Sequence, residues 1–303
     1  MDGVVVIDKP PSWTSHDVVA KVRVITGVKK VGHTGTLDPF ATGVLPLTMG
    51  KATRLSNYFI SSDKVYRGVM RFGFATDTYD LEGVPQGEIS NPALDKGRLE
   101  EILLRYQGKI HQTLPPYSAK KVHGKPMYAY ARKGVTLEAA TKEVTIKSLR
   151  LLDVQGSEAE FELACAAGAF ARSLAHDIGK DYGCGAHLVR LQRTKSGEFP
   201  IEKAIPIMEG TNFYPREHFL ENLILLRDLL GEIPSLAVSA GDKDKLTHGL
   251  DLNMLTSAWN APEYRLLDEN GDLVAIATRL QTFTSPMAQP AQWVRIHPRI
   301  IFI

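Results

Sequence analysis

The chain has 303 residues, of which 44% are hydrophobic and 23% are charged. This is ordinary globular composition over a length that suits two domains, and it argues against a disordered or fibrous protein. The net charge of +2 does not indicate any particular kind of binding partner. The two cysteines lie outside any CxxC or Cys/His cluster, which argues against a disulfide framework or a zinc site.

The N-terminal stretch MDGVVVIDKPPSW lacks the basic segment and long apolar run of a secretory signal. No run of about 18 uninterrupted apolar residues occurs, so no membrane-spanning helix is expected. We therefore predict a cytoplasmic protein.

The first quarter of the chain predicts a strand, two helices and a second strand. Residues 4–7 form a β-branched run that DKPP interrupts, which predicts a strand and a loop. Apolar residues then recur at helical spacing between Ser15, a candidate N-cap, and Gly27, a stop signal. Residues 50–64 predict another helix. In residues 65–72, alternate positions carry two different sets of side chains, Val and Arg on one side and Tyr, Gly, Met and Phe on the other. This pattern predicts a strand with two different faces.

The rest of the chain predicts further mixed elements and a boundary. Residues 99–106 have an amphipathic helical pattern, and residues 158–164 have a strand pattern. Residues 167–185 predict a tight glycine turn into a helix that ends at Gly183. Ile233-Pro234 marks a boundary, after which short apolar runs and the hairpin signal Asn270-Gly271 predict a small β domain.

A basic segment with interleaved tyrosines occupies residues 105–150. It holds ten lysines and arginines against two glutamates. Such a segment is either a solvated charged face or an RNA contact, because phosphates need cations and unstacked bases need aromatic faces. Pro115-Pro116 also favours a projecting loop over packed core.

The stretch GHTGTLDPFATGVLPL, residues 32–47, places one carboxylate, Asp38, in a glycine-punctuated turn. An aspartate before proline commonly initiates a turn by bonding its own backbone. The glycines, however, would let a ligand or another backbone approach closely. From the residues alone, Asp38 is therefore either a turn former or a nucleophile or general base.

Two residues elsewhere have ordinary interpretations that compete with functional ones. Arg172 follows Gly168 at the start of a helical pattern, where a cation opposes the helix dipole, so it is either a surface arginine or the partner of a carboxylate. Tyr66 lies on the alternating strand, where a core tyrosine is the ordinary interpretation.

A series of ordered motifs covers most of residues 1–200. They are GVVVIDKPPSWTSHDVV, KKVGHTGTLDPFATGVLPL, GKATRLSNYF, DKVYRG, FGFATDTYDLEG, PPYSAKKVHGKPMYAYAR, GAFARSLAHDIG and GCGAHLVRLQRT. Together they closely resemble the bacterial tRNA pseudouridine-55 synthases of the TruB family. The last 70 or so residues match less distinctly and look like the PUA RNA-binding domain of this family.

The resemblance implies a reaction and three catalytic residues. A uridine in the T-loop of tRNA would be flipped out, detached at its glycosidic bond, turned and rejoined through C5, with no cofactor and no metal. Asp38 would be the nucleophile, toward the ribose C1′ or by way of a glycal. Tyr66 would stack on the base and help to move a proton, and Arg172 would pair with Asp38.

The resemblance also implies residues that bind RNA. Those in or near the uridine pocket would be Lys9, Pro10, His33, Arg54, Asp80, Phe170 and Leu191. Those on the RNA backbone would be Lys120, Lys121 and Arg132.

Two of these positions depart from the family's usual pattern. Phe170 stands in GAFAR where relatives usually have G-T-Y-[IV]-R, so a hydrogen bond from a tyrosine hydroxyl, worth about 0.5–1.5 kcal/mol where it is made, is absent. Arg54 stands where many relatives have lysine, which keeps the charge but changes its geometry.

By the same resemblance the fold is α+β. Residues 1–232 would form a pseudouridine synthase domain around a large, mainly antiparallel mixed sheet, with an RNA-binding insertion at about 112–142. Residues 233–303 would form a small β-barrel-like PUA domain. The expected partner is tRNA, bound by a monomer that needs no protein partner and no membrane.

Other interpretations stay open. The chain could be an RNA-binding or tRNA-folding protein with a relic site, a pseudouridine synthase for another RNA, including the guide-RNA-dependent relatives, or an aspartate-nucleophile hydrolase. The joint presence of Asp38, Tyr66 and Arg172 favours catalysis, and the chain length favours the stand-alone tRNA enzyme.

Overall fold

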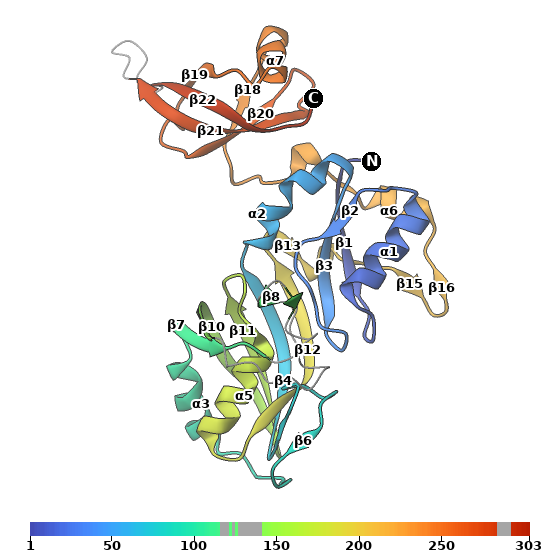
Figure 1. Ribbon diagram of the computed structural model, residues 1–303, viewed down its shortest axis with the longest axis vertical. Helices are drawn as coiled ribbons and strands as arrows, with labels where there is room; N and C mark the ends of the chain where they lie inside the picture. Colours follow the sequence, from blue (N-terminus) through green and yellow to red (C-terminus); the bar gives the residue numbers. More distant parts are fainter. Residues whose placement is uncertain (116–120, 123–124, 127–140, 284–291) are drawn as a thin grey trace.

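The computed structural model describes residues 1–115, 121–122, 125–126, 141–283 and 292–303. Their backbone forms an 11-stranded sheet with helices packed against it and a separate five-stranded sheet with one described helix against it (Figure 1). The predicted α+β fold is confirmed. No helix among the described residues is long and apolar enough to cross a membrane.

The large sheet is mixed but mainly antiparallel, as predicted. Its strands run in the order β14-β1-β3-β12-β4-β11-β10-β7, and only β1 with β14 and β12 with β3 pair in parallel along this path. Short strands β2 (Val31–His33), β13 (Phe199–Pro200) and β17 (Ile224–Leu225) pair at its margin. The path strands are β14 (Ile205–Pro206), β1 (Gly3–Lys9), β3 (Thr42–Met49), β12 (Ala186–Ser196), β4 (Lys64–Phe72), β11 (Glu158–Cys165), β10 (Thr141–Gln155) and β7 (Gly108–Thr113).

Helix α1 (Ser15–Thr26) ends at Gly27, as predicted, in the left-handed conformation. Its N-cap, however, is Thr14 rather than the predicted Ser15, because the Thr14 hydroxyl accepts from the backbone of Asp17 in a capping box. The buried Ser15 hydroxyl instead bonds the backbone of Leu37. Helix α5 (Ala171–Tyr182) ends at Gly183, again as predicted.

The predicted helix at residues 50–64 is two short elements, the 3₁₀ helix η1 (Gly50–Leu55) and α2 (Ser56–Ile60). The amphipathic helix at residues 99–106 is confirmed as α3 (Lys96–Arg105), which packs against α5 and β10. Smaller elements are β5 (Ala75–Thr76), β6 (Pro85–Gln86), β8 (Lys121–Val122), β9 (Lys125–Pro126), β15 (Met208–Glu209), β16 (Asn212–Phe213) and α6 (Arg216–Glu221).

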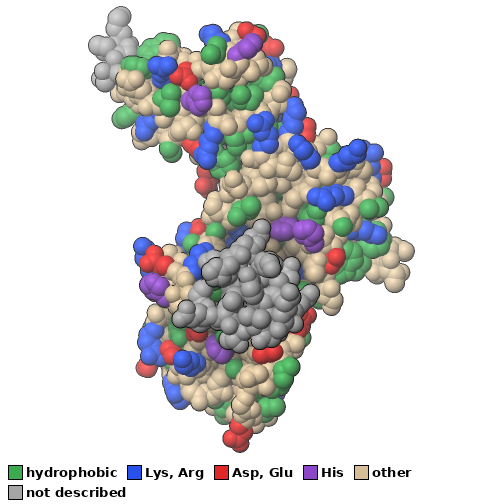
Figure 2. All heavy atoms as spheres, viewed as in Figure 1, with side chains coloured by type: hydrophobic (Ala, Val, Ile, Leu, Met, Phe, Trp, Pro, Cys, Tyr) green, Lys and Arg blue, Asp and Glu red, His purple; other side chains and the backbone are tan. Residues whose placement is uncertain are grey.

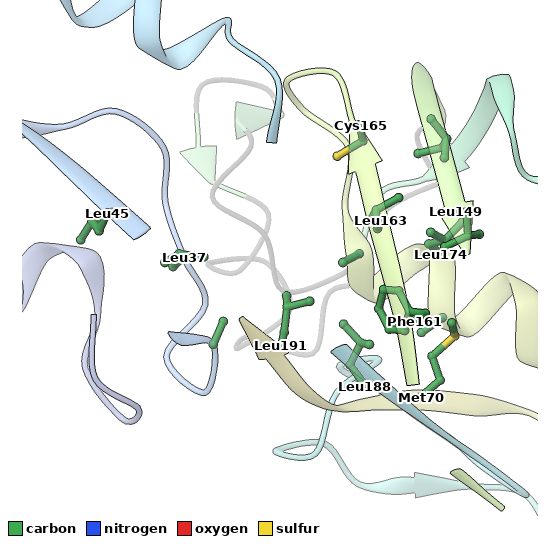
Figure 3. Close-up of a cluster of buried hydrophobic side chains, with 14 of the residues drawn as sticks. Leu37, Leu45, Met70, Leu149, Phe161, Leu163, Cys165, Leu174, Leu188 and Leu191 are labelled. Atoms are coloured by element: carbon green, nitrogen blue, oxygen red, sulfur yellow. The ribbon is translucent and has the colours of Figure 1, made fainter. Parts of the chain in front are cut away.

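The main hydrophobic core lies between the large sheet and its helices. Figure 3 shows part of this cluster, where apolar side chains from β4, β11, β12 and α5 meet. Leu37, one residue before Asp38, belongs to the same cluster and is 3% exposed. The loop that carries Asp38 is therefore anchored in the core rather than lying free on the surface.

The predicted RNA-binding insertion starts from the paired strands β7 and β10, in which Thr113 lies opposite Thr141. Lys120 and Arg132 lie outside the described residues. Lys121 is described only as part of the short strand β8. The insertion and its three predicted phosphate contacts stay predictions.

The C-terminal lobe is the curled five-stranded sheet with one helix, α7 (Ala240–Thr247), at the top of Figure 1. The predicted hairpin at Asn270-Gly271 joins β20 to β21. In the order in which they pair, the strands are β18 (Ser235–Ala237), β20 (Glu263–Leu267), β21 (Leu273–Phe283), β22 (Gln292–Ile301) and β19 (Leu252–Thr256).

The two lobes share a hydrophobic cluster at their junction. Leu273, Ile276 and Phe302 of the C-terminal lobe belong to the same cluster as Leu55 and Phe59 of the first lobe. Arg54 lies here, where its guanidinium donates to the carbonyl of Ile301. The structure thus places Arg54 at the lobe junction, although the sequence predicted a substrate contact.

Candidate active site

Asp38 lies on the connection between β2 and β3, and buried groups hold the backbone on both sides of it. The Ser15 hydroxyl accepts from the Leu37 N–H at 2.9 Å, and the Lys9 ammonium donates to the Pro39 carbonyl at 3.0 Å. Arg193 donates to the Gly35 carbonyl from Nη2 at 3.0 Å and to the Val44 carbonyl from Nε at 2.7 Å. These bonds fix where the Asp38 carboxylate points.

Arg172 binds that carboxylate with a two-point contact. Its Nε lies 2.9 Å from Oδ2 of Asp38, and its Nη2 lies 2.8 Å from Oδ1. Nη1 donates to the Thr78 carbonyl at 3.1 Å and lies 3.4 Å from Oδ2 of Asp80. The predicted pairing of Arg172 with Asp38 is confirmed, and Asp80 adds a second carboxylate to the same guanidinium.

The two carboxylates differ in their surroundings. The Asp38 side chain is 31% exposed, whereas that of Asp80 is 5% exposed. Burial raises the pKa of Asp80, while a hydrogen bond from Thr78 and the charge of Arg172 oppose the shift. Asp38 is thus the carboxylate that a ligand can reach, and Asp80 supports the arginine from behind.

A cavity of about 270 Å³ opens at Asp38. Tyr66 forms one wall, from the position on β4 directly opposite Arg193 of β12. Burial raises the pKa of Tyr66, and the neighbouring Arg193 opposes the shift, so the phenol is protonated at neutral pH. Apolar groups from the turn before α5 and from β12 complete the cavity, including Ala167, Ala169, Phe170 and Leu191.

The structure brings most of the predicted catalytic and pocket residues together. Asp38, Tyr66, Arg172, Phe170 and Leu191 all line the cavity, with Asp80 behind Arg172.

Three of the other predicted residues surround or support the Asp38 loop. His33 lies next to the loop, where its Nδ1 accepts from the Gly35 N–H at 3.4 Å and its ring meets that of His16 edge to face. Burial lowers the pKa of His33 and favours its neutral form. Lys9 is fully buried and, besides Pro39, bonds the carbonyls of Pro10 and Trp13.

Sequence reasoning missed Arg193, Lys64 and Gln112. Arg193 and Lys64 are buried cations on the cavity wall, and burial lowers the pKa of Lys64 to about 8. A signal for Arg193 was present, because it is two residues from Leu191 and so shares a strand face with an apolar pocket residue. Gly43 carried another signal, since a Cβ there would lie 2.3 Å from the Arg193 carbonyl, which brings β3 and β12 together.

No group of three or more His, Cys, Asp or Glu side chains that could hold a metal ion occurs among the described residues. The chemistry available in the cavity is that of a reachable carboxylate held by arginine, a neutral phenol and an apolar wall. A carboxylate in such a place can act as a nucleophile or a general base, and a phenol can stack on a flat ring or move a proton.

Solved structures share this fold along the whole chain. One chain in "Structure of H/ACA RNP bound to a substrate RNA containing 2′-deoxyuridine" superposes with a TM-score of 0.71 at 22% identity, over 99% of this chain and 85% of that one. A chain in "Crystal Structure of a Cbf5-Nop10-Gar1 Complex" has a TM-score of 0.70 at 23% identity, with the same coverage. At this identity the likeness concerns the fold.

Sequence comparison defines the class. Residues 23–171 match the model of the TruB family pseudouridylate synthase N-terminal domain, and residues 172–231 match that of the tRNA pseudouridylate synthase B C-terminal domain. The chain is thus a pseudouridylate synthase, an isomerase.

Two relatives narrow the class to one family. A protein of Solibacter usitatus named tRNA pseudouridine synthase B is 41% identical over 278 residues, which span 91% of this chain and 95% of that protein. Its namesake in Symbiobacterium thermophilum is 43% identical over 253 residues, 82% of this chain and 83% of that protein. The chain belongs to the TruB family of pseudouridylate synthases.

Proposed function

We propose that this enzyme isomerises uridine 55 in the T-loop of tRNA to pseudouridine, with Asp38 as the nucleophile. The observation that carries the proposal is the reachable Asp38 carboxylate, held by two bonds from Arg172 on the wall of a cavity that also contains Tyr66. The relatives named tRNA pseudouridine synthase B supply the substrate class.

The reaction balances within the substrate. The bond between C1′ and N1 breaks, and its electron pair leaves with the base. The base turns, C5 bonds to C1′, the proton on C5 is lost, and N1 takes up a proton. Because nothing is oxidised or reduced, carboxylate and phenol groups such as those of Asp38 and Tyr66 are sufficient in kind.

Access requires the uridine to leave its stack, at a cost of a few kcal/mol. Tyr66 offers a ring on which the uracil can stack, and such stacking contributes roughly 1–3 kcal/mol per base. The neutral His33 beside the Asp38 loop has its Nδ1 occupied by Gly35, so its Nε2–H is the donor available to the opened RNA.

Phosphate binding would come from exposed cations on the first lobe and from the insertion. Figure 2 shows Lys and Arg side chains spread over the face that carries the first lobe and its junction with the C-terminal lobe. Lys29, Lys30 and Lys51 are exposed on this lobe, and Lys120, Lys121 and Arg132 are the predicted contacts of the insertion. Such contacts supply affinity that falls steeply with salt.

The test is to map pseudouridine in unmodified tRNA transcripts after incubation with the purified protein. The proposal expects one new pseudouridine, at position 55, and none when that uridine is replaced by cytidine. Modification at another position would overturn the assigned site. Absence of any pseudouridine, with tRNA bound, would favour the RNA-binding alternative.

A further inference from the structure

Gln112 is a buried amide with an unusual pair of contacts. It is 1% exposed and lies near the end of β7, at the edge of the large sheet. Its Oε1 accepts from the Phe170 N–H at 3.0 Å, and its Nε2 donates to the Phe170 carbonyl at 3.2 Å. One side chain thus satisfies both backbone groups of a single residue 58 positions away.

Phe170 is the N-cap of α5, and its carbonyl also accepts the first helical bond, from the Leu174 N–H at 3.1 Å. Residues at that position usually bond the first turn through a short polar side chain, and Phe170 has no such bond. Its ring lines the cavity instead. The neighbouring Ser173 hydroxyl donates to the Thr113 carbonyl at 2.6 Å. Two consecutive residues of β7, Gln112 and Thr113, are therefore hydrogen-bonded to the start of α5.

The first turn of α5 also carries Arg172. A shift of the Phe170 backbone would move both the apolar wall of the cavity and the guanidinium that holds Asp38. Misplacement of reacting groups by about 1 Å can cost roughly 100-fold in rate. The amide of Gln112 therefore lies where a single side chain can control the geometry of the cavity without touching a substrate.

We infer that Gln112 is a positioning residue for isomerisation: its buried amide fixes Phe170 and thereby directs Arg172 at Asp38. This role rests on the proposed function, since it concerns the same cavity. In this role Gln112 acts through Phe170 and Arg172 and does not itself contact the substrate.

The test uses Gln112→Glu, which has the same shape and can switch its hydrogen bonding. An ionised carboxylate accepts from the Phe170 N–H but repels the carbonyl, whereas the protonated acid can accept and donate as the amide does. Burial favours the protonated form of such a group. Gln112→Met has nearly the same length and no polar atoms, so it loses both bonds at every pH.

Turnover relative to wild type is measured at about pH 9.5 and about pH 6, on either side of the pKa of about 8–9 that a buried carboxyl group can reach. For Gln112→Glu we expect kcat to be about 10- to 100-fold lower at the higher pH and to recover most of that loss at the lower one. KM for tRNA should change little. Gln112→Met should be low at both.

The matched control is Gln107→Glu, just before the same strand. The Gln107 side chain donates to the Leu149 carbonyl at 3.4 Å, and among the described residues Gln107 is not one of those that line the cavity. We expect it to follow wild type at both pH values. Rates are divided by the folded fraction of each variant, taken from thermal unfolding, so that a loss of stability is not mistaken for a loss of kcat.

Wild-type kcat for Gln112→Glu at both pH values, or an equal loss at both, would overturn the role of Gln112. Failure of Gln112→Met to fold leaves the test intact, because Gln112→Glu at the lower pH restores both bonds. Failure of wild type to modify uridine 55 would instead overturn the proposed function, so the two outcomes are distinguishable.

Discussion

Two arginine–carboxylate contacts of equal length lie in different regions of the molecule. In the cavity, Nη2 of Arg172 lies 2.8 Å from Asp38, and the arginine side chain is 6% exposed. In the C-terminal lobe, Nη1 of Arg299 lies 2.8 Å from Glu263, and that arginine is 63% exposed. The distances are the same, but Arg172 is buried and contacts both oxygens of Asp38, whereas Arg299 is exposed and contacts Oε1 of Glu263.

Burial changes what each contact does. Water competes for Arg299 and screens its charge, so the pair contributes little to stability. Arg172 is shielded from water and also bonds Thr78 and Asp80, so its removal would leave two carboxylates and a carbonyl without their partner. The cavity thus depends on one guanidinium, whereas the C-terminal lobe distributes its charges over separate surface pairs.

Among the following substitutions, Arg172→Lys should cause the largest loss of turnover. Lysine keeps the charge but cannot make the two-point contact. We expect turnover to fall about 100-fold because Asp38 is no longer held. Unfolding in urea should show a loss of about 1–3 kcal/mol, since buried acceptors lose donors. Single-turnover rates near those of wild type would contradict the account.

Removal of the charges of Lys120, Lys121 and Arg132 together tests the insertion rather than the cavity. The slope of log K against log salt for tRNA binding should become shallower by about 2, because fewer counterions are released. Lys96→Gln, at an exposed position on α3, serves as the single-charge control. An unchanged slope would show that these three residues of the insertion do not bind phosphates of the tRNA.

Lys9→Met tests a buried cation against Lys243, a half-buried cation held in an ion pair. Burial lowers the pKa of Lys9 to about 8 from its ordinary 10.5, so between these values the unfolded chain binds more protons. The free energy of unfolding of wild type minus that of Lys9→Met should therefore rise as pH increases from about 8 to 10.5.

Lys243 should have the opposite sign. Its bond to Asp268, at 2.7 Å, raises its pKa. Its contribution to stability is therefore complete below 10.5 and is lost at higher pH, as the folded protein releases the proton. Denaturant titrations of both lysine-to-methionine variants, from about pH 8 to 10.5 for Lys9 and above 10.5 for Lys243, measure the two slopes. Slopes of the same sign would contradict the assignment of burial to one lysine and ion pairing to the other.

Arg299→Lys should have the smallest effect. It repeats the substitution made at Arg172, at the same contact distance, on an exposed pair. The free energy of unfolding should change by less than about 1 kcal/mol, and turnover should stay at the wild-type level. A loss as large as that of Arg172→Lys would show that burial does not distinguish the two regions.

The residues alone predicted the alternating strand of Tyr66, whereas the α+β class and the contact between Arg172 and Asp38 came from the resemblance to the TruB family. The position of Arg172 at a helix start left it as either a surface arginine or the partner of an unnamed carboxylate. The ends of α1 and α5 were also predictable. Each helix ends at a glycine, which adopts the left-handed conformation of a helix C-cap without steric cost.

Other features depend on contacts between distant segments that no local pattern reports. Ser15 looked like an N-cap, but its hydroxyl bonds Leu37, which is 22 residues away. Arg54 was predicted in the uridine pocket, yet its partner is the carbonyl of Ile301. Gln112 carried no local signal, because an amide in a strand reveals neither its burial nor its partner on another element.

The central claim is that Asp38 is the nucleophile, and Asp38→Asn tests it most directly. Release of tritium from C5 of uridine in tRNA measures turnover, and filter binding measures affinity. The control is Asp63→Asn, an exposed carboxylate that pairs with Lys147. The account predicts that Asp38→Asn binds tRNA and releases no tritium above background, while Asp63→Asn turns over normally. Ordinary tritium release by Asp38→Asn would contradict it.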